Sequence, residues 1–281
     1  MGTAEVSDNL WGNKLYQQRA REAFPFLVRQ ALIGEPIYYS DLAEEMGMPN
    51  ERNLNYVLGC IGTTILELSK QKNEDIPPIQ CLVINKATKL PGEGFGWFIS
   101  EADFKKLDTK QKRIVVNGQL SKIYSYPRWL ELLDELGLNP PNFPEPIKKK
   151  SMGGGGEGEA HKKLKEFVAN NPTVVELPQS CPRGETEFNL HSGDSVDVVF
   201  SWRKEIIAVE VKSLISDVGD IHRGLYQCVK YQAVLEAMLG IQGKPKNVKT
   251  LLLLEGNFPK ELVSTKNMLG IDVLSNITVK S

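Results

Sequence analysis

Apolar residues in the first half of the chain recur mostly at the spacing of α-helices. The pattern predicts a helix over 14–33 that is interrupted near Pro25, a short helix that begins at Ser40, and a longer helix over 51–70. The longer helix carries one apolar stripe, formed by Leu54, Val57, Leu58, Ile61, Ile65 and Leu68. This half is therefore predicted to be mainly helical.

Two strands are expected after the longer helix. The segments IQCLVIN and GFGWFIS have strand-like composition and are joined by a turn around Pro91 and Gly92. Further helical segments follow over 103–137. Helix, short helix, longer helix and hairpin, in that order, is the plan of a winged-helix module.

In the second half, helices and strands alternate. We expect a helix over 157–169, strands near 195–200 and 206–212, and a helix over 221–239. The strand KTLLLLEG, the helix PKELVSTKNMLG and the strand IDVLS complete the pattern. This alternation predicts an α/β fold in which helices pack on a mixed sheet.

A stretch rich in proline and glycine separates the two halves. The segment NPPNFPEPIKKKSMGGGGEG, over 139–158, contains four prolines and then four consecutive glycines, which do not favour regular structure. We therefore expect one domain over 1–138, a linker over 139–156 and a second domain over 157–281.

Charge and composition narrow the function classes. The net charge is -1, from 34 basic and 35 acidic residues, so no overall basic field points to nucleic acid. Local runs such as Lys162, Lys163 and Lys165 are usually solvated helix faces. No apolar run approaches the roughly 18 residues that cross a bilayer, and no secretion signal begins the chain, so a cytoplasmic protein without a membrane role is expected.

The four cysteines are scattered along the chain without a CxxC pair. This spacing argues against a zinc site or a disulfide framework, so buried free thiols are expected.

Three charged residues stand within two apolar strand segments, SVDVVFSW and EIIAVEVKS. Side chains alternate along a strand, so Glu210 and Lys212 should share one face while Val209 and Val211 share the other. We also expect Val196 and Val198 to enter the apolar layer, which would send Asp197 to the opposite side, toward Glu210. The alternative is an exposed face on which Glu210 and Lys212 form a minor ion pair.

These residue types suit metal-assisted phosphodiester hydrolysis. Two hard carboxylates on neighbouring strands, Asp197 and Glu210, can hold Mg²⁺ and leave positions for water. Lys212 would orient that water or stabilise the charge that develops.

The motif resembles that of the PD-(D/E)xK nuclease superfamily. An Asp is followed thirteen residues later by a Glu, and after one spacer by a Lys, written here as VD and EVK. Val196 stands where the family's name-giving motif has proline. The resemblance implies a restriction-endonuclease-like sheet, Mg²⁺ as cofactor with Mn²⁺ as a substitute, and hydrolysis that leaves 5′-phosphates.

The helix after the EVK segment adds polar candidates. Arg223, Gln227 and Tyr231 lie four residues apart on one face, with Lys230 beside it. This resembles the QxxxY signature of RecB-like members, which implies that Gln227 and Tyr231 join the active site and that Arg223 and Lys230 contact DNA. Alternatively, Tyr231 is a core residue with its hydroxyl bonded.

The first helix of the second domain supplies one more candidate. Family members commonly carry an acidic residue on this helix as a further metal or water ligand. Glu157 is the expected residue here, because it shares a face with His161 and Leu164.

The first domain resembles the winged helix of O6-alkylguanine alkyltransferases and alkyltransferase-like proteins. Tyr39, Arg52 and Pro78 match its tyrosine, recognition-helix arginine and Pro-rich strand. The reactive Cys-His step falls on Ile79 and Gln80, so alkyl transfer is not expected. The resemblance implies DNA binding through Tyr39 and Arg52. The alternative is a winged helix used for protein contacts.

Together these features predict a DNA endonuclease, with restriction-type defence against foreign or modified DNA as its setting. A homodimer would fit, because cutting both strands of a duplex usually needs two centres. Two alternatives stay open: a DNA-repair nuclease directed to alkylated bases, and a DNA-binding module without catalysis.

Overall fold

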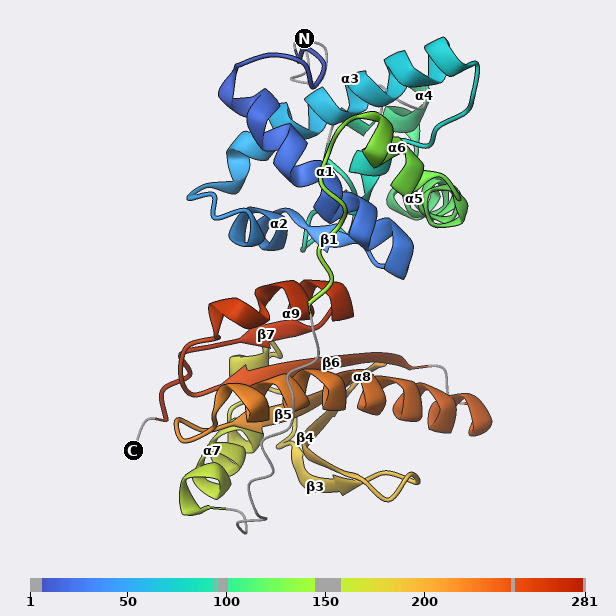
Figure 1. The fold of residues 1–281 in the computed structure, drawn as a ribbon. Helices are drawn as coiled ribbons and strands as arrows, with labels where there is room; N and C mark the ends of the chain where they lie inside the picture. Colours follow the sequence, from blue (N-terminus) through green and yellow to red (C-terminus); the bar gives the residue numbers. More distant parts are fainter. Residues whose placement is uncertain (1–6, 93, 96–100, 145–157, 244–245, 280–281) are drawn as a thin grey trace. The chain divides into compact units, whose positions relative to one another are not determined.

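The computed structural model divides the chain into two compact units, Met1–Pro144 and Glu145–Ser281 (Figure 1). The residues that the structure describes are 7–92, 94–95, 101–144, 158–243 and 246–279.

The described part of the first unit is mainly helical, with two very short strands. Its elements are α1 (Leu15–Ile33), β1 (Ile37–Tyr38), α2 (Tyr39–Glu45), η2 (Glu51–Asn53), α3 (Leu54–Lys72), η3 (Ile79–Leu82), β2 (Val83–Ile84), α4 (Glu101–Lys106), α5 (Thr109–Ser125) and α6 (Trp129–Glu135). The strands β1 and β2 pair in parallel.

One apolar core holds this unit together. It includes Phe24 of α1, Ile61 of α3 and Trp129 of α6, all nearly or fully buried. A buried ion pair, with Arg29 Nη1 at 2.6 Å from Glu45 Oε1, also ties α1 to α2. Removing one partner of such a pair leaves an unpaired buried charge, so the contact fixes how the two helices meet.

Two expectations for this unit are wrong. The helix α1 runs without interruption through Pro25. Proline removes one helical hydrogen bond, but the buried side chains of Phe24, Leu27 and Val28 keep the helix packed on both sides of it. The short helix begins at Tyr39, one residue before the expected start at Ser40, and it has no side-chain cap.

The first of the two expected hairpin strands is also much shorter than predicted. Over IQCLVIN, the structure has the 3₁₀ turn η3 and then only the two-residue strand β2, because Pro78 starts a turn and offers no N–H to a strand ladder. Most of GFGWFIS lies outside the described residues, and Gly94 and Phe95 form a turn. An antiparallel bridge joins Ile84 to Pro91.

The second unit is a mixed five-stranded sheet with helices on both faces (Figure 1). Its elements are α7 (Glu159–Asn170), η5 (Pro172–Val175), β3 (Glu185–Asn189), β4 (Ser195–Trp202), β5 (Glu205–Lys212), α8 (Val218–Ile241), β6 (Asn247–Leu254), η6 (Lys260–Leu262), α9 (Val263–Leu269) and β7 (Asp272–Leu274). The mixed α/β architecture agrees with the expected alternation of elements.

The strands follow the order β3-β4-β5-β6-β7. The pairs β3–β4 and β4–β5 are antiparallel, whereas β5–β6 and β6–β7 are parallel. Apolar side chains of α7 pack on one face with Val198 and Val209. Side chains of α8 pack on the other face with Val199 and Ala208. Strand β5 lies at the centre and pairs over its full length with β6.

Two general expectations can be checked on the described residues. All four cysteines are free and buried, as predicted. No helix in the described part of the chain has both the length and the apolar character needed to cross a bilayer.

Candidate active site

The strands β4 and β5 bring three charged residues to the end of their shared ladder. Pairing runs from Trp202 opposite Glu205 to Val198 opposite Val209, and it ends there. The next position on each strand is Asp197 and Glu210. Asp197 Oδ2 accepts a hydrogen bond from the backbone N–H of Val211 at 2.8 Å, which ties the end of β4 to β5.

Strict alternation does not hold at Asp197, and this corrects one expectation. Val198 packs in the cluster that contains Leu164 of α7, whereas Val196 packs in the cluster that contains Leu235 of α8. The pairing partner of this position on β3 is irregular, because Glu187 has a φ of 54°. Such a break in a ladder twists the strand locally. As a result, Val196 and Val198 lie on different faces of the sheet, and the Asp197 side chain lies near α7.

Glu210 and Lys212 lie side by side on the face of β5 that α8 covers. Lys212 Nζ donates to Glu210 Oε1 at 2.7 Å, and the two side chains are only 14% and 4% exposed. Val209 and Val211 lie on the other face, as alternation predicts. Buried charges are costly unless they are paired, so this pair is not the exposed surface pair of the alternative interpretation.

The pair fits beneath α8 because that helix has a glycine above it. A Cβ at Gly224 would lie 3.0 Å from Lys212 Cε and 2.8 Å from Leu252 Cδ1. Either distance is too short for an ordinary contact. Gly224 therefore lets α8 approach the charged pair closely.

Two residues of α7 surround Asp197. His161 Nε2 lies 3.4 Å from Asp197 Oδ1, and Lys165 Nζ lies 3.8 Å from the same atom. Lys165 also forms an ion pair with Glu187, and its side chain is 6% exposed. The expectation that Lys165 belongs to a solvated run is thus wrong.

Sequence reasoning missed Lys165 and Glu187 as members of this cluster. One signal was available for Lys165, because it lies four residues after His161 on the same helix face. Glu187 had no such signal, since the strand β3 was not expected.

Tyr231 of α8 connects the sheet to the charged pair. Its hydroxyl donates to the carbonyl oxygen of Ser195 at 3.0 Å and accepts from Gln227 Nε2 at 3.1 Å. The side chain is buried among apolar residues and also lies against Glu210. Tyr231 is therefore a core residue with a bonded hydroxyl and a neighbour of the candidate site.

The two carboxyl groups differ in electrostatics. Burial, with a contribution from the charge of Asp197, raises the pKa of Glu210 to about 7, although Lys212 and Tyr231 act in the opposite direction. Burial would also raise the pKa of Asp197, but hydrogen bonds from His161 and Val211 hold it below its usual value. Without a further cation, the cluster therefore disfavours two negative charges.

The other expected site residues lie apart from this cluster or outside the described residues. Arg223 is exposed and pairs with Asp220. Lys230 pairs with Asp194 at 2.7 Å. Glu157 lies outside the described residues, and α7 begins two residues later. The expected acidic ligand, Glu157, is therefore not placed by the structure.

The two first-unit candidates have different surroundings. The Tyr39 hydroxyl lies in a pocket, where it accepts from the backbone N–H of Gly92 at 3.2 Å. Arg52 is exposed on η2. Its backbone N–H donates to the side chain of Asn50, which caps that turn.

The donor set fits Mg²⁺ better than a metal that needs several protein ligands. Among the described residues, no three or more His, Cys, Asp or Glu side chains form a group that could hold a metal ion. Mg²⁺, however, often keeps most of its water and uses one or two carboxylates. Asp197 and Glu210 are two carboxylates of this kind, and the raised pKa of Glu210 marks a place where added positive charge would be favourable.

Comparisons with protein-family models, with curated proteins and with solved structures find no match for this chain.

Proposed function

We propose that the chain is a Mg²⁺-dependent DNA endonuclease whose second unit is a restriction-endonuclease-like domain of the PD-(D/E)xK type. One observation carries the proposal. Asp197 and Glu210 stand at the end of the β4–β5 ladder, and the buried ammonium of Lys212 bonds to Glu210 there. A lysine and a carboxylate that are both buried at this edge of the sheet are costly for stability alone, which favours a functional role.

Each residue has a defined task in this proposal. Asp197 and Glu210 bind the cation, which would supply positive charge to the phosphate and activate water when present. Lys212 stabilises the negative charge that develops on the phosphate. Tyr231 holds Glu210 in place, while His161 and the Val211 N–H hold Asp197. Arg223 and Lys230 lie on the exposed side of α8 and contact the DNA backbone.

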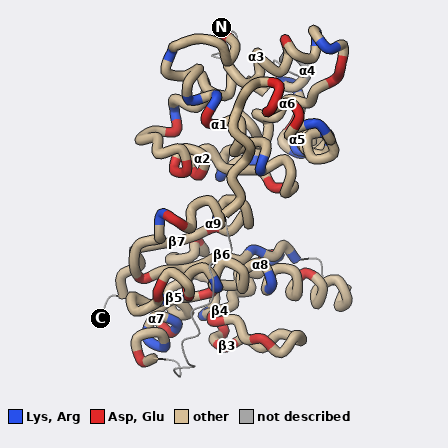
Figure 2. Tube along the Cα trace, viewed as in Figure 1, with Lys and Arg blue, Asp and Glu red and all other residues tan. Residues whose placement is uncertain are grey.

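We further propose that the first unit is a winged helix that recognises DNA. The order of α1, β1, α2, α3 and β2 supports this assignment. Figure 2 shows that Lys and Arg positions are interspersed with Asp and Glu over both units. DNA recognition thus depends on local groups such as Tyr39 and Arg52 more than on a general basic field. Restriction-type defence is the proposed setting, and two copies would cut both strands.

The test is a cleavage assay with purified full-length protein. Plasmid DNA, modified and unmodified, is incubated in Mg²⁺ or in EDTA with the wild type and with Lys212→Ala. We expect nicking or cutting that requires Mg²⁺ and that falls by about 10²-fold or more in the variant, since a group that stabilises transition-state charge has been removed. Gel analysis of the plasmid forms measures the rates.

Lys204→Ala is the matched control, because Lys204 is an exposed lysine in the turn between the same two strands. We expect it to cut at the wild-type rate. Equal cutting by Lys212→Ala and the wild type would refute the role of Lys212. DNA binding without any cutting in Mg²⁺ or Mn²⁺ would instead support a non-catalytic binding module.

A further inference from the structure

Helix α5 carries positive charge and no negative charge, although the chain as a whole is balanced. Its 17 residues include no Asp or Glu. They include four basic residues, which are Lys110, Lys112, Arg113 and Lys122, and Figure 2 marks Lys and Arg positions along this helix. The whole chain has 34 basic and 35 acidic residues. The positive charge of α5 is therefore a local feature of the first unit.

Three of these cations have no acidic partner in the part of the chain that the structure describes. Lys110, Arg113 and Lys122 are exposed, and no described Asp or Glu forms an ion pair with them. By contrast, Arg128 of the following helix pairs with Glu74 at 2.6 Å. Neighbouring cations without acidic partners create a local positive potential, which attracts an anionic molecule.

The inner face of α5 holds the helix on the core. Val116 and Ile123 are its buried residues, and the indole N–H of Trp129 donates to the carbonyl oxygen of Ile123 at 2.8 Å. The start of the helix is fixed by Asp108, whose carboxylate accepts from the backbone N–H of Gln111 at 2.8 Å. The outer face is thus held in place before any partner binds, which lowers the cost of binding.

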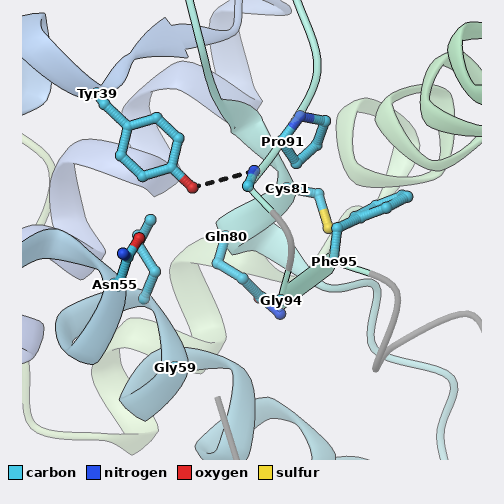
Figure 3. A pocket seen from close by; sticks show the side chains of 10 residues that line it. Tyr39, Asn55, Gly59, Gln80, Cys81, Pro91, Gly94 and Phe95 are labelled. Carbon is cyan, nitrogen blue, oxygen red and sulfur yellow. Dashed lines mark hydrogen bonds between the residues drawn. The ribbon is translucent and has the colours of Figure 1, made fainter. Parts of the chain in front are cut away.

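Lys112 differs from the other three cations because it lies over an aromatic ring. Its ammonium is 5.7 Å from the centroid of the Phe104 ring. Phe104 in turn packs edge-on against Phe95, with ring centroids 4.9 Å apart, and Figure 3 shows Phe95 at the wall of the Tyr39 pocket. Lys112 therefore contributes to the packing beside α5 and is not part of its outer face.

The outer face combines cations with uncharged side chains. One side of the helix carries residues three or four positions apart, namely Lys110, Arg113, Asn117 and Ser121. Ile114 lies on the same side and is 65% exposed. This face therefore offers a partner positive charge, hydrogen-bonding groups and one apolar contact.

Gly118 lies next to Asn117 on this face. Glycine disfavours the middle of a helix, and a Cβ at Gly118 would meet no described atom within 4 Å. Packing within the described part of the first unit therefore does not require this glycine, whereas a Cβ at Gly224 would meet Lys212 and Leu252. A glycine also lets another molecule approach the backbone closely.

We propose that the outer face of α5 lies in the major groove of duplex DNA, with Lys110, Arg113 and Lys122 at backbone phosphates and Gly118 at the point of closest approach. The major groove is about 12 Å wide and admits an α-helix. Lys110 and Lys122 are separated by about 18 Å along the helix axis. Cations at the two ends of the helix therefore reach phosphates on both walls of the groove.

Duplex DNA fits this face better than an acidic protein does. DNA presents phosphates along both sides of a groove, which matches cations at both ends of a helix that has no acid between them. Asn117 and Ile114 then face the base edges, where an amide bonds to adenine and an aliphatic group contacts the methyl group of thymine. That the second unit cuts this bound duplex rests on the proposed function.

The test measures binding to a short labelled duplex by fluorescence anisotropy, with full-length protein in EDTA so that no cutting occurs. The variant combines Lys110→Gln, Arg113→Gln and Lys122→Gln. We expect its affinity at about 0.1 M salt to fall at least tenfold. The slope of log affinity against log salt concentration should become less steep by about 2 to 3, since each phosphate contact contributes roughly 0.9. The Tm should stay unchanged, because all three side chains are exposed.

Lys70→Gln is the matched control, because Lys70 is an exposed lysine of the same unit that lies on α3. It removes the same charge as each single change in α5, so it reports the effect of net charge alone. We expect the wild-type affinity and salt slope in Lys70→Gln. Each of Lys110→Gln, Arg113→Gln and Lys122→Gln alone should reduce the slope by about 1.

Gly118→Leu tests the close approach separately from charge. Leucine favours a helix more than glycine does, and its Cβ has open space here, so the Tm should stay at or above that of the wild type. The same side chain would keep the groove away from the helix backbone, so duplex binding should weaken at least tenfold. Gly118→Ala adds only a methyl group and should raise the Tm with a smaller loss of affinity.

Three results would overturn the proposal: an unchanged salt slope in the triple variant, equal weakening by Lys70→Gln and by the single α5 variants, or wild-type duplex binding by both Gly118→Leu and Gly118→Ala. An unchanged slope would favour an acidic protein as the partner of this face.

Lys212→Ala separates this proposal from the proposed function. It should bind duplex DNA in EDTA much as the wild type does, because Lys212 belongs to the second unit. Duplex binding that depends on α5, without cutting in Mg²⁺, would count against the nuclease alone. Mg²⁺-dependent cutting, with wild-type binding in every α5 variant, would count against the role of α5 alone.

Discussion

Glu210 is a carboxyl group with a pKa of about 7 because it is buried and lies near a second carboxylate. Lys212 lowers this value but does not restore the ordinary one. The proton on Glu210 therefore competes with any cation that binds there near neutral pH. The protonation of Glu210 should therefore be measurable through the stability of the folded protein.

The pH dependence of stability should report Glu210. Its pKa is raised from 4.5 in the unfolded chain to about 7 in the folded one, so the folded protein binds the proton more tightly. Its stabilising effect is full below about pH 4.5 and is lost as the pH rises to about 7. We expect the unfolding free energy of the wild type, relative to Glu210→Gln, to fall by on the order of 3 kcal/mol over this window.

Urea unfolding in EDTA at a series of pH values measures this difference. If Glu210 binds the cation as proposed, Mg²⁺ should reduce the loss, because it would bind the charged form of Glu210. If the wild type and Glu210→Gln showed parallel pH profiles, the raised pKa of Glu210 would be wrong.

The sequence predicts the charged pair better than it predicts the surroundings of Asp197. Alternation along one strand is a local property, so the shared face of Glu210 and Lys212 follows from their spacing. The direction of Asp197 depends on a break in pairing next to Glu187, which no local pattern shows. The place of Lys165 depends on that same irregular residue of β3.

At the scale of elements, the site is formed where α8 crosses β5. The helix can lie close to the strand only because Gly224 has no side chain at the crossing. Glycine is otherwise unfavourable within helices, by roughly 1 kcal/mol relative to alanine. Its presence here reflects the packing of the charged pair.

Gly224→Ala should therefore harm the site although alanine favours helices. The new methyl group would meet Lys212 and Leu252, so we expect a loss of stability of about 1–3 kcal/mol and slower DNA cleavage. Gly240→Ala lies in the same helix, where a Cβ meets nothing within 4 Å. It should be neutral or stabilise the protein by up to about 1 kcal/mol.

Thermal unfolding and the plasmid assay on both variants measure these effects. Wild-type cleavage and stability in Gly224→Ala would show that the packing above Lys212 is not tight.

Elements with strong periodicity were predictable, and elements defined by tertiary contacts were not. The long helices α3 and α8 and the apolar strands β5 and β6 follow from their sequence patterns. Strand β3 has the polar sequence ETEFN and lies at the edge of the sheet. Its composition does not favour a strand, and its pairing with β4 stabilises the extended conformation. A strand was expected where the structure has the turn η3. In this 3₁₀ turn all four side chains are buried, a tertiary packing that the local sequence pattern does not show.

At the scale of the whole molecule, the two units have separate cores. The core of the first unit runs from Leu10 to Leu136, and the three clusters of the second unit begin at Leu164. No described core residue is shared between them. Each unit thus buries its own apolar surface, which is the physical condition for folding alone.

We expect residues 1–144 and 145–281, produced separately, each to fold and to unfold cooperatively. The reason is that neither piece loses any member of its own core. Circular dichroism with thermal unfolding of each piece measures this. A piece that lacks a cooperative transition would show that its core is not sufficient.

The reactivity of the four buried cysteines can report local unfolding in both units. Cys60 and Cys81 belong to the first unit, and Cys181 and Cys228 belong to the second. Since each cysteine is buried in the folded structure, a maleimide reagent should attach mainly after the surrounding segment opens. Peptide mass mapping would show the order in which the four cysteines are labelled. This order would rank the frequency of local opening around each native cysteine.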